Sequence, residues 1–232
     1  MPDAGLDDRS IVESWHANAA AWTRAVRSNA IDSRRLVTDQ AILDAIDAHE
    51  PHSVLDLGCG EGWLARALHA RGVEVTGVDA TPELIDGARA AGGGRFQVCD
   101  YEALDYDVVG RRFDLVVANF ALLGRESVEH VFRAVPALLE ARGALIVQTL
   151  HPVTSCPSDV YRDGWHPGSW SGFGSDFVTP PPWYFRTLGS WIRLFIDHGF
   201  RLTDLREPTH PQTGQPASLI LSGQPVTGDS PA

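Results

Sequence analysis

The spacing of hydrophobic positions changes near residue 53 of this 232-residue chain. Before that point the apolar side chains follow helical spacing: Ile42 and Ile46 are four residues apart, and Trp15 and Trp22 are one heptad apart. Side chains with these separations lie on one face of a helix. The pattern therefore predicts an N-terminal helical cap over residues 1–50.

From residue 53 onward, short apolar runs alternate with amphipathic segments. The runs are four to eight residues long and rich in Val, Ile and Leu, as is typical of strands buried on both faces of a parallel sheet. One face of the last intervening helix is marked by Val128, Phe132, Val135 and Leu139, and Pro136 lies inside it. We expect strands at 53–57, 73–79, 95–100, 113–120 and 143–150, with helices between them.

Residues 151–186 interrupt this alternation with a stretch rich in Pro, Gly, Ser and aromatic residues. Ten of the 20 aromatic residues lie between Tyr161 and Phe195. A long loop without regular structure is usually functional or disordered, and its aromatic content disfavours disorder. We expect a lid over the carboxyl edge of the sheet, where open α/β sheets bind ligands. The alternative, that these rings form a small separate core beneath a loop, remains open.

A helix over 186–199 and two strands, at 200–208 and 217–223, complete the pattern. The predicted fold class is α/β: a doubly wound, mostly parallel seven-stranded sheet of Rossmann-like type, with N-terminal helices and an antiparallel C-terminal edge hairpin. We expect one domain over residues 1–232. Its parts are the cap (1–50), a ligand-binding half (53–150), the lid (151–186), and the C-terminal helix and hairpin (187–222).

The net charge restricts the class of partner. The 19 basic and 30 acidic residues give −11 at neutral pH, which repels phosphate backbones and anionic lipid surfaces. We therefore expect no nucleic-acid partner and no membrane partner. The same charge weakly favours a neutral or cationic small ligand.

Cysteine usage and the absence of a long apolar run indicate the compartment. The three cysteines have no CxxC spacing, which argues against a disulfide framework and against a zinc knuckle. No apolar run approaches the roughly 18 residues that a membrane span requires, and the N-terminus is acidic. We expect a cytoplasmic protein. The sequence leaves a homodimer open.

The strongest local motif is VLDLGCGEGW, a strand followed by three glycines at alternate positions and then a helix. Glycines there let the backbone turn sharply and let a ligand approach closely, next to the positive end of the helix. A dinucleotide fingerprint would need a small residue where Trp63 stands, which argues against NAD and FAD. The motif alone is also compatible with a plain strand-to-helix turn.

This motif resembles motif I of the class I S-adenosylmethionine-dependent methyltransferases, and neighbouring segments agree. Asp79 in GVDAT stands where that family keeps an acidic residue for the ribose hydroxyls, and Asp100 in CDYEAL where it uses one on the adenine amino group. The resemblance covers roughly residues 30–222 and is strongest to small-molecule enzymes of the ubiquinone-biosynthesis-like group (methyltransferase type 11/12). It implies S-adenosylmethionine as cofactor and S-adenosylhomocysteine as product. The cofactor-binding residues it implies are Arg34, Asp56, Gly58, Cys59, Gly60, Gly62, Asp79, Ala80, Asp100, Tyr101 and Asn119.

Arg34 and Asn119 have alternative interpretations. Arg34 resembles an arginine that some relatives place near the cofactor carboxylate, yet a solvated helix charge is equally compatible. Enzymes that methylate amide or nucleobase amino groups continue from an asparagine with two prolines and an aromatic residue. Here the chain reads NFAL after the strand, so Asn119 is expected to line the cofactor edge.

The acceptor side is less defined. His151, just past the fifth strand, is the candidate general base because an imidazole titrates near neutral pH; a structural histidine is the alternative. We expect substrate contacts from Trp15, His166, Tyr184 and Arg186, the last of which could instead cap the loop. No metal is expected, because Asn119 is the only polar group past the fourth strand and catechol-type enzymes need acidic residues there.

The expected function is methyl transfer to an oxygen or nitrogen atom of a small, partly apolar acceptor. A catalytically silent module that binds S-adenosylmethionine or S-adenosylhomocysteine and acts as a regulator is the alternative. A third possibility is that the cofactor serves a different reaction.

Overall fold

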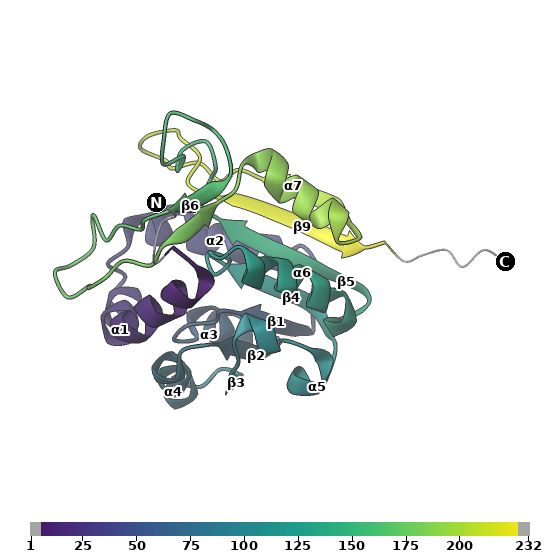
Figure 1. Ribbon diagram of the computed structural model, residues 1–232. Coiled ribbons are helices and arrows are strands. Elements are labelled where there is room, and N and C mark those ends of the chain that lie inside the picture. The colour runs from purple at the N-terminus through teal and green to yellow at the C-terminus, as the bar shows by residue number, and fades with distance from the viewer. Residues whose placement is uncertain (1–5, 227–232) are drawn as a thin grey trace.

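A computed structural model describes residues 6–226 and shows a seven-stranded sheet between two layers of helices (Figure 1). The strand order is β3-β2-β1-β4-β5-β9-β8. This confirms the predicted doubly wound fold with its C-terminal hairpin. The strands are β1 (Ser53–Leu57), β2 (Glu74–Asp79), β3 (Arg95–Val98), β4 (Phe113–Asn119), β5 (Leu139–Thr149), β8 (Phe200–Arg206) and β9 (Leu219–Pro225).

The first five strands are parallel, and β9 runs against them, whereas β8 at the sheet edge again has their direction. β1 pairs in parallel with β2 on one side and with β4 on the other, while β9 pairs antiparallel with both β5 and β8. Because parallel strands end at the same edge, the residues that follow β1, β2 and β4 meet there. The glycine motif follows β1 directly, so this edge is where the functional site must be sought.

Each helix layer buries one apolar face against the sheet. On one side lie α2 (Asp39–Asp47), α3 (Trp63–His69) and α4 (Pro82–Ala91), and on the other α5 (Tyr106–Val109), α6 (Glu126–Leu138) and α7 (Leu188–Asp197). On the second side the ring of Phe132 packs 4.9 Å from Phe195 and 6.0 Å from Phe200, centroid to centroid. Burial on both faces explains why the strands read as continuous apolar runs.

The N-terminal cap consists of a long helix, α1 (Asp8–Arg27), then a π-helical turn, η1 (Arg34–Thr38), that leads into α2. Trp15 and Trp22 lie 5.1 Å apart in an edge-to-face arrangement, which confirms that they share one face of α1. Residues 1–5 of the expected cap lie outside the described residues. The π-turn was not predicted; such turns frequently occur at functional sites.

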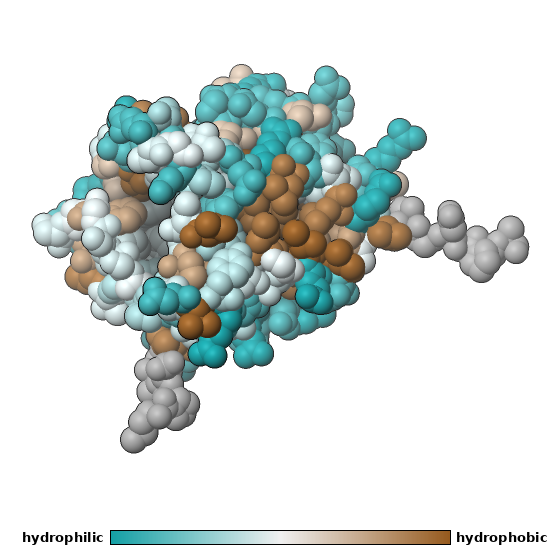
Figure 2. Space-filling model, turned by 90° about the horizontal axis from the view of Figure 1, so that it is seen from above, coloured by the Kyte–Doolittle hydropathy of each residue, from teal (hydrophilic) through white to brown (hydrophobic). Residues whose placement is uncertain are grey.

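The lid carries a small sheet of its own. β6 (Gly164–His166) and β7 (Trp183–Phe185) form a two-stranded antiparallel pair, whereas the sequence led us to expect no regular structure there. Seen from above, the half of the surface near α7 and β9 carries a continuous apolar patch, and the half that carries the lid is paler and hollowed (Figure 2). No helix within residues 6–226 is both long and apolar enough to cross a membrane.

Two predicted boundaries were wrong. Leu139 is not on α6, because the helix ends at Leu138 and Leu139 already has extended backbone angles as the first residue of β5. Pro136 cannot donate a backbone hydrogen bond, which weakens the last turn of that helix. The third strand stops at Val98, because Asp100 caps a short 3₁₀ turn, η2 (Tyr101–Ala103).

Candidate active site

The glycine loop is held against the neighbouring strand. The backbone N–H groups of Gly58 and Cys59 both donate to the carbonyl oxygen of Val78 on β2, at 2.8 and 3.0 Å. Gly58 has a φ of +66°, and a Cβ there would collide with Ala121 and come within 2.7 Å of the Tyr101 hydroxyl. Only glycine fits this position, because both the backbone conformation and the free space exclude a side chain.

Asp79 ends β2 and braces the same loop. One carboxylate oxygen accepts from the N–H of Gly60 at 2.9 Å, and the other from the N–H of Thr81 at 2.8 Å. Burial raises the pKa of Asp79, although both backbone hydrogen bonds oppose this shift. Each oxygen retains a lone pair that can accept a hydroxyl group. Asp79 can therefore hold a diol while it fixes the loop.

Asp56, on β1 just before the loop, is buried and incompletely satisfied. The residue is 2% exposed, and its Oδ2 has no hydrogen-bond partner among the described residues. Burial, and then the charge of Asp79, raise the pKa of Asp56 to about 7. An unpaired buried carboxylate is costly, so this oxygen is suited to receive a cationic donor such as an ammonium group.

Together these features fit S-adenosylmethionine. The unpartnered Asp56 oxygen suits the amino group of its methionine part, and the spare lone pairs of Asp79 suit the two ribose hydroxyls. Gly58 has no Cβ, so a ligand can approach the backbone of the loop closely. Asn119, at the end of β4, adds another buried side-chain oxygen that has no hydrogen-bond partner within residues 6–226. Within residues 6–226, no group of three or more His, Cys, Asp or Glu side chains is placed to hold a metal ion.

The remaining residues expected around the cofactor differ in what their side chains do. Asp100 is exposed, and its carboxylate accepts from the N–H of Ala103 at 2.9 Å. Tyr101 packs against the loop, where burial raises the pKa of its hydroxyl well above the usual range. The thiol of Cys59 is buried in the core, so this residue offers only its backbone to the site. Ala80 is half-buried beside Asp79.

Arg34 lies in η1, close to the loop. Its guanidinium stacks 4.6 Å above the ring of Trp63 and donates to Asp39 at 2.9 Å, and only 12% of the side chain is exposed. The ring of Trp22, on α1, lies 5.9 Å from the same guanidinium. Arg34 is therefore an anchored cation beside the loop and not a solvated helix charge.

A recess lies at the carboxyl ends of β4 and β5, beneath the lid. The space between its atoms, open solvent included, is about 280 Å³, but only about 10 Å³ of it is wide enough for the centre of a water molecule. Tyr184 and Arg186 are among its lining residues. The other lining residues are Leu122, Leu123, Thr149, Leu150, Ser155, Trp183, Phe185 and Trp191. Most of these side chains are apolar or aromatic, and a few polar groups lie among them, as is usual for a small-molecule site.

Arg186 is buried and holds the lid to the loop after β4. It donates to the carbonyl oxygens of Gly124 and Arg125, at 2.7 and 3.2 Å, and its cation stacks on Tyr184 and Trp191. Desolvation lowers the pKa of this guanidinium. The loop-capping role that the sequence left open is therefore present in the structure.

Trp15 and His166 do not line the recess. Trp15 contacts Trp22 and Trp170 in the aromatic cluster between α1 and the lid, with ring centroids 5.1 and 5.8 Å away. His166 lies on β6, with its ring 6.3 Å from those of Trp183 and Phe185. Both residues support the lid from outside the recess.

His151 follows β5 and is almost fully buried. Its Nε2 lies 2.7 Å from a carboxylate oxygen of Glu207, and its Nδ1 accepts from the N–H of Val153 at 3.3 Å. Since Nδ1 accepts, the proton of the neutral ring is on Nε2 and is donated to Glu207. His151 does not line the recess directly, but Leu150 and Ser155 on either side of it do. Glu207 was not predicted, because nothing in the sequence after β8 indicates this pairing.

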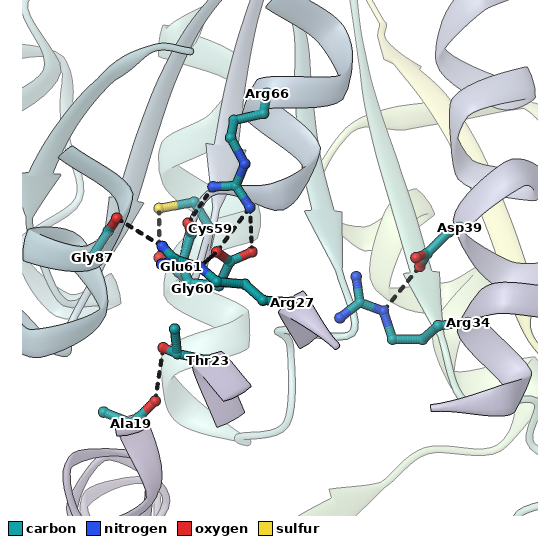
Figure 3. Close-up of polar contacts among 10 residues, drawn as sticks. All are labelled: Ala19, Thr23, Arg27, Arg34, Asp39, Cys59, Gly60, Glu61, Arg66 and Gly87. Atoms are coloured by element: carbon teal, nitrogen blue, oxygen red, sulfur yellow. Dashed lines mark hydrogen bonds and ion pairs between the residues drawn. The ribbon is translucent and has the colours of Figure 1, made fainter. Parts of the chain in front are cut away.

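Glu61, inside the glycine loop, was not among the predicted site residues. Its side chain is fully buried, and its carboxylate receives Arg66 of α3 at 2.7 and 2.8 Å and Arg27 of α1 at 2.8 Å (Figure 3). A charged residue between two loop glycines was the only available signal. The partner from α1 is 34 positions away and could not be inferred.

The sheet order, the loop braced by Asp79 and the lid over the carboxyl edge define a Rossmann-like methyltransferase fold. Residues 54–143 match the family model described as a methyltransferase domain. A malonyl-[acyl-carrier protein] O-methyltransferase of Pseudescherichia vulneris is 30% identical over 58% of this chain and 53% of its own length. The chain therefore spans about half of that relative.

Solved structures agree with this assignment. A crystal structure of an S-adenosylmethionine-dependent methyltransferase from Mesorhizobium loti is similar at a TM-score of 0.60, with 25% identity over 78% of this chain and 95% of that one. The fold of 1,6-didemethyltoxoflavin-N1-methyltransferase from Burkholderia thailandensis is similar at a TM-score of 0.65. The two sequences are 21% identical over 98% of this chain and 93% of that one. Residues 54–143 thus form a methyltransferase domain that is similar to the class I S-adenosylmethionine-dependent methyltransferases, and the cofactor of this domain is S-adenosylmethionine.

Proposed function

We propose that the protein transfers a methyl group to an oxygen or nitrogen atom of a small, partly apolar acceptor that binds in the recess beneath the lid. The composition of the recess carries this proposal: leucine and aromatic side chains line it, at the edge where the glycine loop lies, and a small acceptor would enter as the lid moves. The net charge of −11 disfavours a polyanionic acceptor. One sequence relative is named an O-methyltransferase and one structural neighbour an N1-methyltransferase, so these likenesses do not select between the two atoms.

When bound, S-adenosylmethionine would supply a sulfonium methyl group: the acceptor atom would bond to the methyl carbon as the carbon–sulfur bond breaks, leaving S-adenosylhomocysteine. Asp56 and Asp79 bind and orient the cofactor, and the aromatic lid excludes water from the recess. For a hydroxyl acceptor we propose His151 as the base. Its proton acceptor is Nδ1, which gives up the 3.3 Å bond from Val153, while Glu207 stabilises the imidazolium through Nε2.

Release of S-adenosylhomocysteine tests the proposal. The protein is incubated with S-adenosylmethionine and a panel of phenols, amines and carboxylic acids, and product is measured by mass spectrometry. We expect turnover with at least one small apolar member, and none by Asp79→Ala. Tight binding of S-adenosylhomocysteine without turnover of any acceptor would instead favour the silent regulatory module.

A further inference from the structure

Glu61 lies inside the cofactor loop, but its partners come from two different helices. Arg66 of α3 contacts both carboxylate oxygens and also donates to the backbone carbonyl of Glu61 at 2.7 Å. α3 begins one residue beyond the glycine loop, so this pair moves with the loop. A buried carboxylate needs such compensation, and Arg66 supplies it whatever the position of α1.

The contact between Arg27 and Glu61 can break while the pair of Glu61 and Arg66 stays intact. Arg27 comes from the last turn of α1, its side chain is 47% exposed, and its Nε donates to Glu61 at 2.8 Å. Its Nη2 donates to the carbonyl of Gly87 on α4 at 3.0 Å. Figure 3 shows Arg27 and Arg66 converging on Glu61 from different helices. The C-terminal end of α1 is thus attached to the loop through one charged contact that can open without leaving Glu61 unpaired.

The middle of α1 is attached to the lid. Asn18 is fully buried; its amide donates to the carbonyl of Val178 at 2.6 Å and accepts from the N–H of the same residue at 2.8 Å. Ser14 donates to the carbonyl of Thr179 at 2.6 Å. Trp15 and Trp22 extend the contact to the aromatic rings of residues 170–177. A buried amide paired with both backbone groups of one residue holds that segment in a single register.

α1 therefore connects the cofactor loop to the lid segment 170–179. Trp22 also lies over the loop, since its Nε1 would be 3.6 Å from a Cβ at Gly60. A ligand that orders the loop fixes the position of Glu61, and Glu61 then fixes Arg27 and α1. Because α1 holds Val178 and Thr179, the same ordering reaches the lid.

We infer that Glu61 is a positioning residue through which α1 makes closure of the lid depend on cofactor occupancy. The inference rests on the cofactor-binding part of the proposed function and is independent of the acceptor. It gives the enzyme an order of events: the cofactor binds first, and the lid over the recess closes in response.

Hydrogen exchange of segment 170–179, with and without S-adenosylhomocysteine, tests this coupling. In the unmodified protein we expect the ligand to slow exchange in this segment. Arg27→Met should abolish the slowing and weaken S-adenosylhomocysteine binding about tenfold, which corresponds to about 1.4 kcal/mol. Arg27→Lys keeps a cation that reaches Glu61, so it should restore most of both effects.

The matched control is Arg9→Met, because Arg9 lies on the same helix and its ion pair is with exposed Glu13. It should leave ligand binding and lid protection unchanged. Asn18→Ala provides a second variant at the opposite end of the connection: it should lose lid protection while its affinity for S-adenosylhomocysteine stays within about threefold of the unmodified protein.

Two outcomes would overturn the inference, and they are distinguishable. If folded Arg27→Met binds S-adenosylhomocysteine normally and still protects segment 170–179, α1 does not couple the two sites, and the proposed function stands. If the unmodified protein fails to bind S-adenosylhomocysteine at millimolar concentration, the proposed function fails together with this inference.

Discussion

The carboxylate of Asp79 accepts the backbone N–H of Gly60 at 2.9 Å, which ties the end of β2 to the middle of the glycine loop. The residue expected to hold the ribose therefore also holds the loop on which the rest of the cofactor lies. Loss of this carboxylate removes a ligand contact and a support at the same time.

Asp79→Ala is therefore expected to weaken S-adenosylhomocysteine binding at least about a hundredfold, because two charge-assisted hydrogen bonds and a loop brace are lost together. Isothermal titration calorimetry measures this directly. His151→Ala serves as the comparison and should bind with unchanged affinity. Equal losses in the two variants would show that His151 belongs to the cofactor site and not to the acceptor side.

Gly58→Ala should also abolish cofactor binding, for a steric reason. The new Cβ would collide with Ala121 and would demand a φ of +66° from a residue with a side chain. Gly72→Ala is the matched control, since Gly72 has a φ of +84° and open space around its Cβ position. It should cost about 1–2 kcal/mol of stability, because a Cβ disfavours the left-handed conformation, and leave binding unchanged. Normal binding by Gly58→Ala would mean that the loop does not contact the ligand.

Asp56 predicts a pH dependence of cofactor binding. With a pKa of about 7, its carboxylate is charged above pH 7 and protonated below it. Affinity for the ammonium-bearing ligand should therefore fall as pH drops from 8 to 6, by up to about tenfold per unit. Asp56→Asn should bind more weakly at pH 8 and show a flat profile. A profile unchanged by this substitution would assign the titration to another group.

Asp56→Asn, which should weaken cofactor binding, should stabilise the cofactor-free protein. The pKa of Asp56 is higher in the folded protein than the usual 3.8, so the folded state binds the extra proton between about pH 4 and 7. The free energy of unfolding therefore falls as pH rises through this window. At pH 8, cofactor-free Asp56→Asn should be more stable by about 1–3 kcal/mol, since the unpaired charge is gone. Thermal unfolding without ligand measures this, and a lower Tm would contradict it.

The pairing of His151 and Glu207 predicts a split between binding and turnover. If the acceptor is a hydroxyl, His151→Ala should lower kcat about 10²- to 10⁴-fold, because a general base typically contributes that factor. Glu207→Gln should lower kcat without weakening S-adenosylhomocysteine binding, since a neutral amide stabilises an imidazolium less than a carboxylate does. If His151→Ala turned over at the rate of the unmodified protein, the histidine would have only a structural role in the 151–155 turn.

The sequence predicted the fold because its signals were local. Apolar runs located every strand of the main sheet, and the spacing of Trp15 and Trp22 located α1. Asp79 and Gly58 were found because they stand next to strand ends, where topology alone brings them together. The start of β5 was misplaced because Leu139 suits the apolar face of a helix and a buried strand equally well.

Long-range pairings could not be predicted from local signals. Glu61, Asn18 and Glu207 acquire their roles from partners 34, 160 and 56 positions away. Asp100 looked like an adenine contact by position, and the structure shows that its carboxylate caps η2. Nothing in the spacing of residues reveals which of two hydrogen-bonding tasks a side chain performs.

The sheet order also sets the sequence of folding events. β9 is the last strand among the residues that the structure describes, yet it lies inside the sheet, between β5 and β8. β8 has no other partner in this sheet, so it cannot join until β9 has left the ribosome and docked. During synthesis the cofactor half can assemble first, while β5 presents an open edge until the C-terminal hairpin arrives. Newly made chains should therefore be most prone to aggregation in that interval.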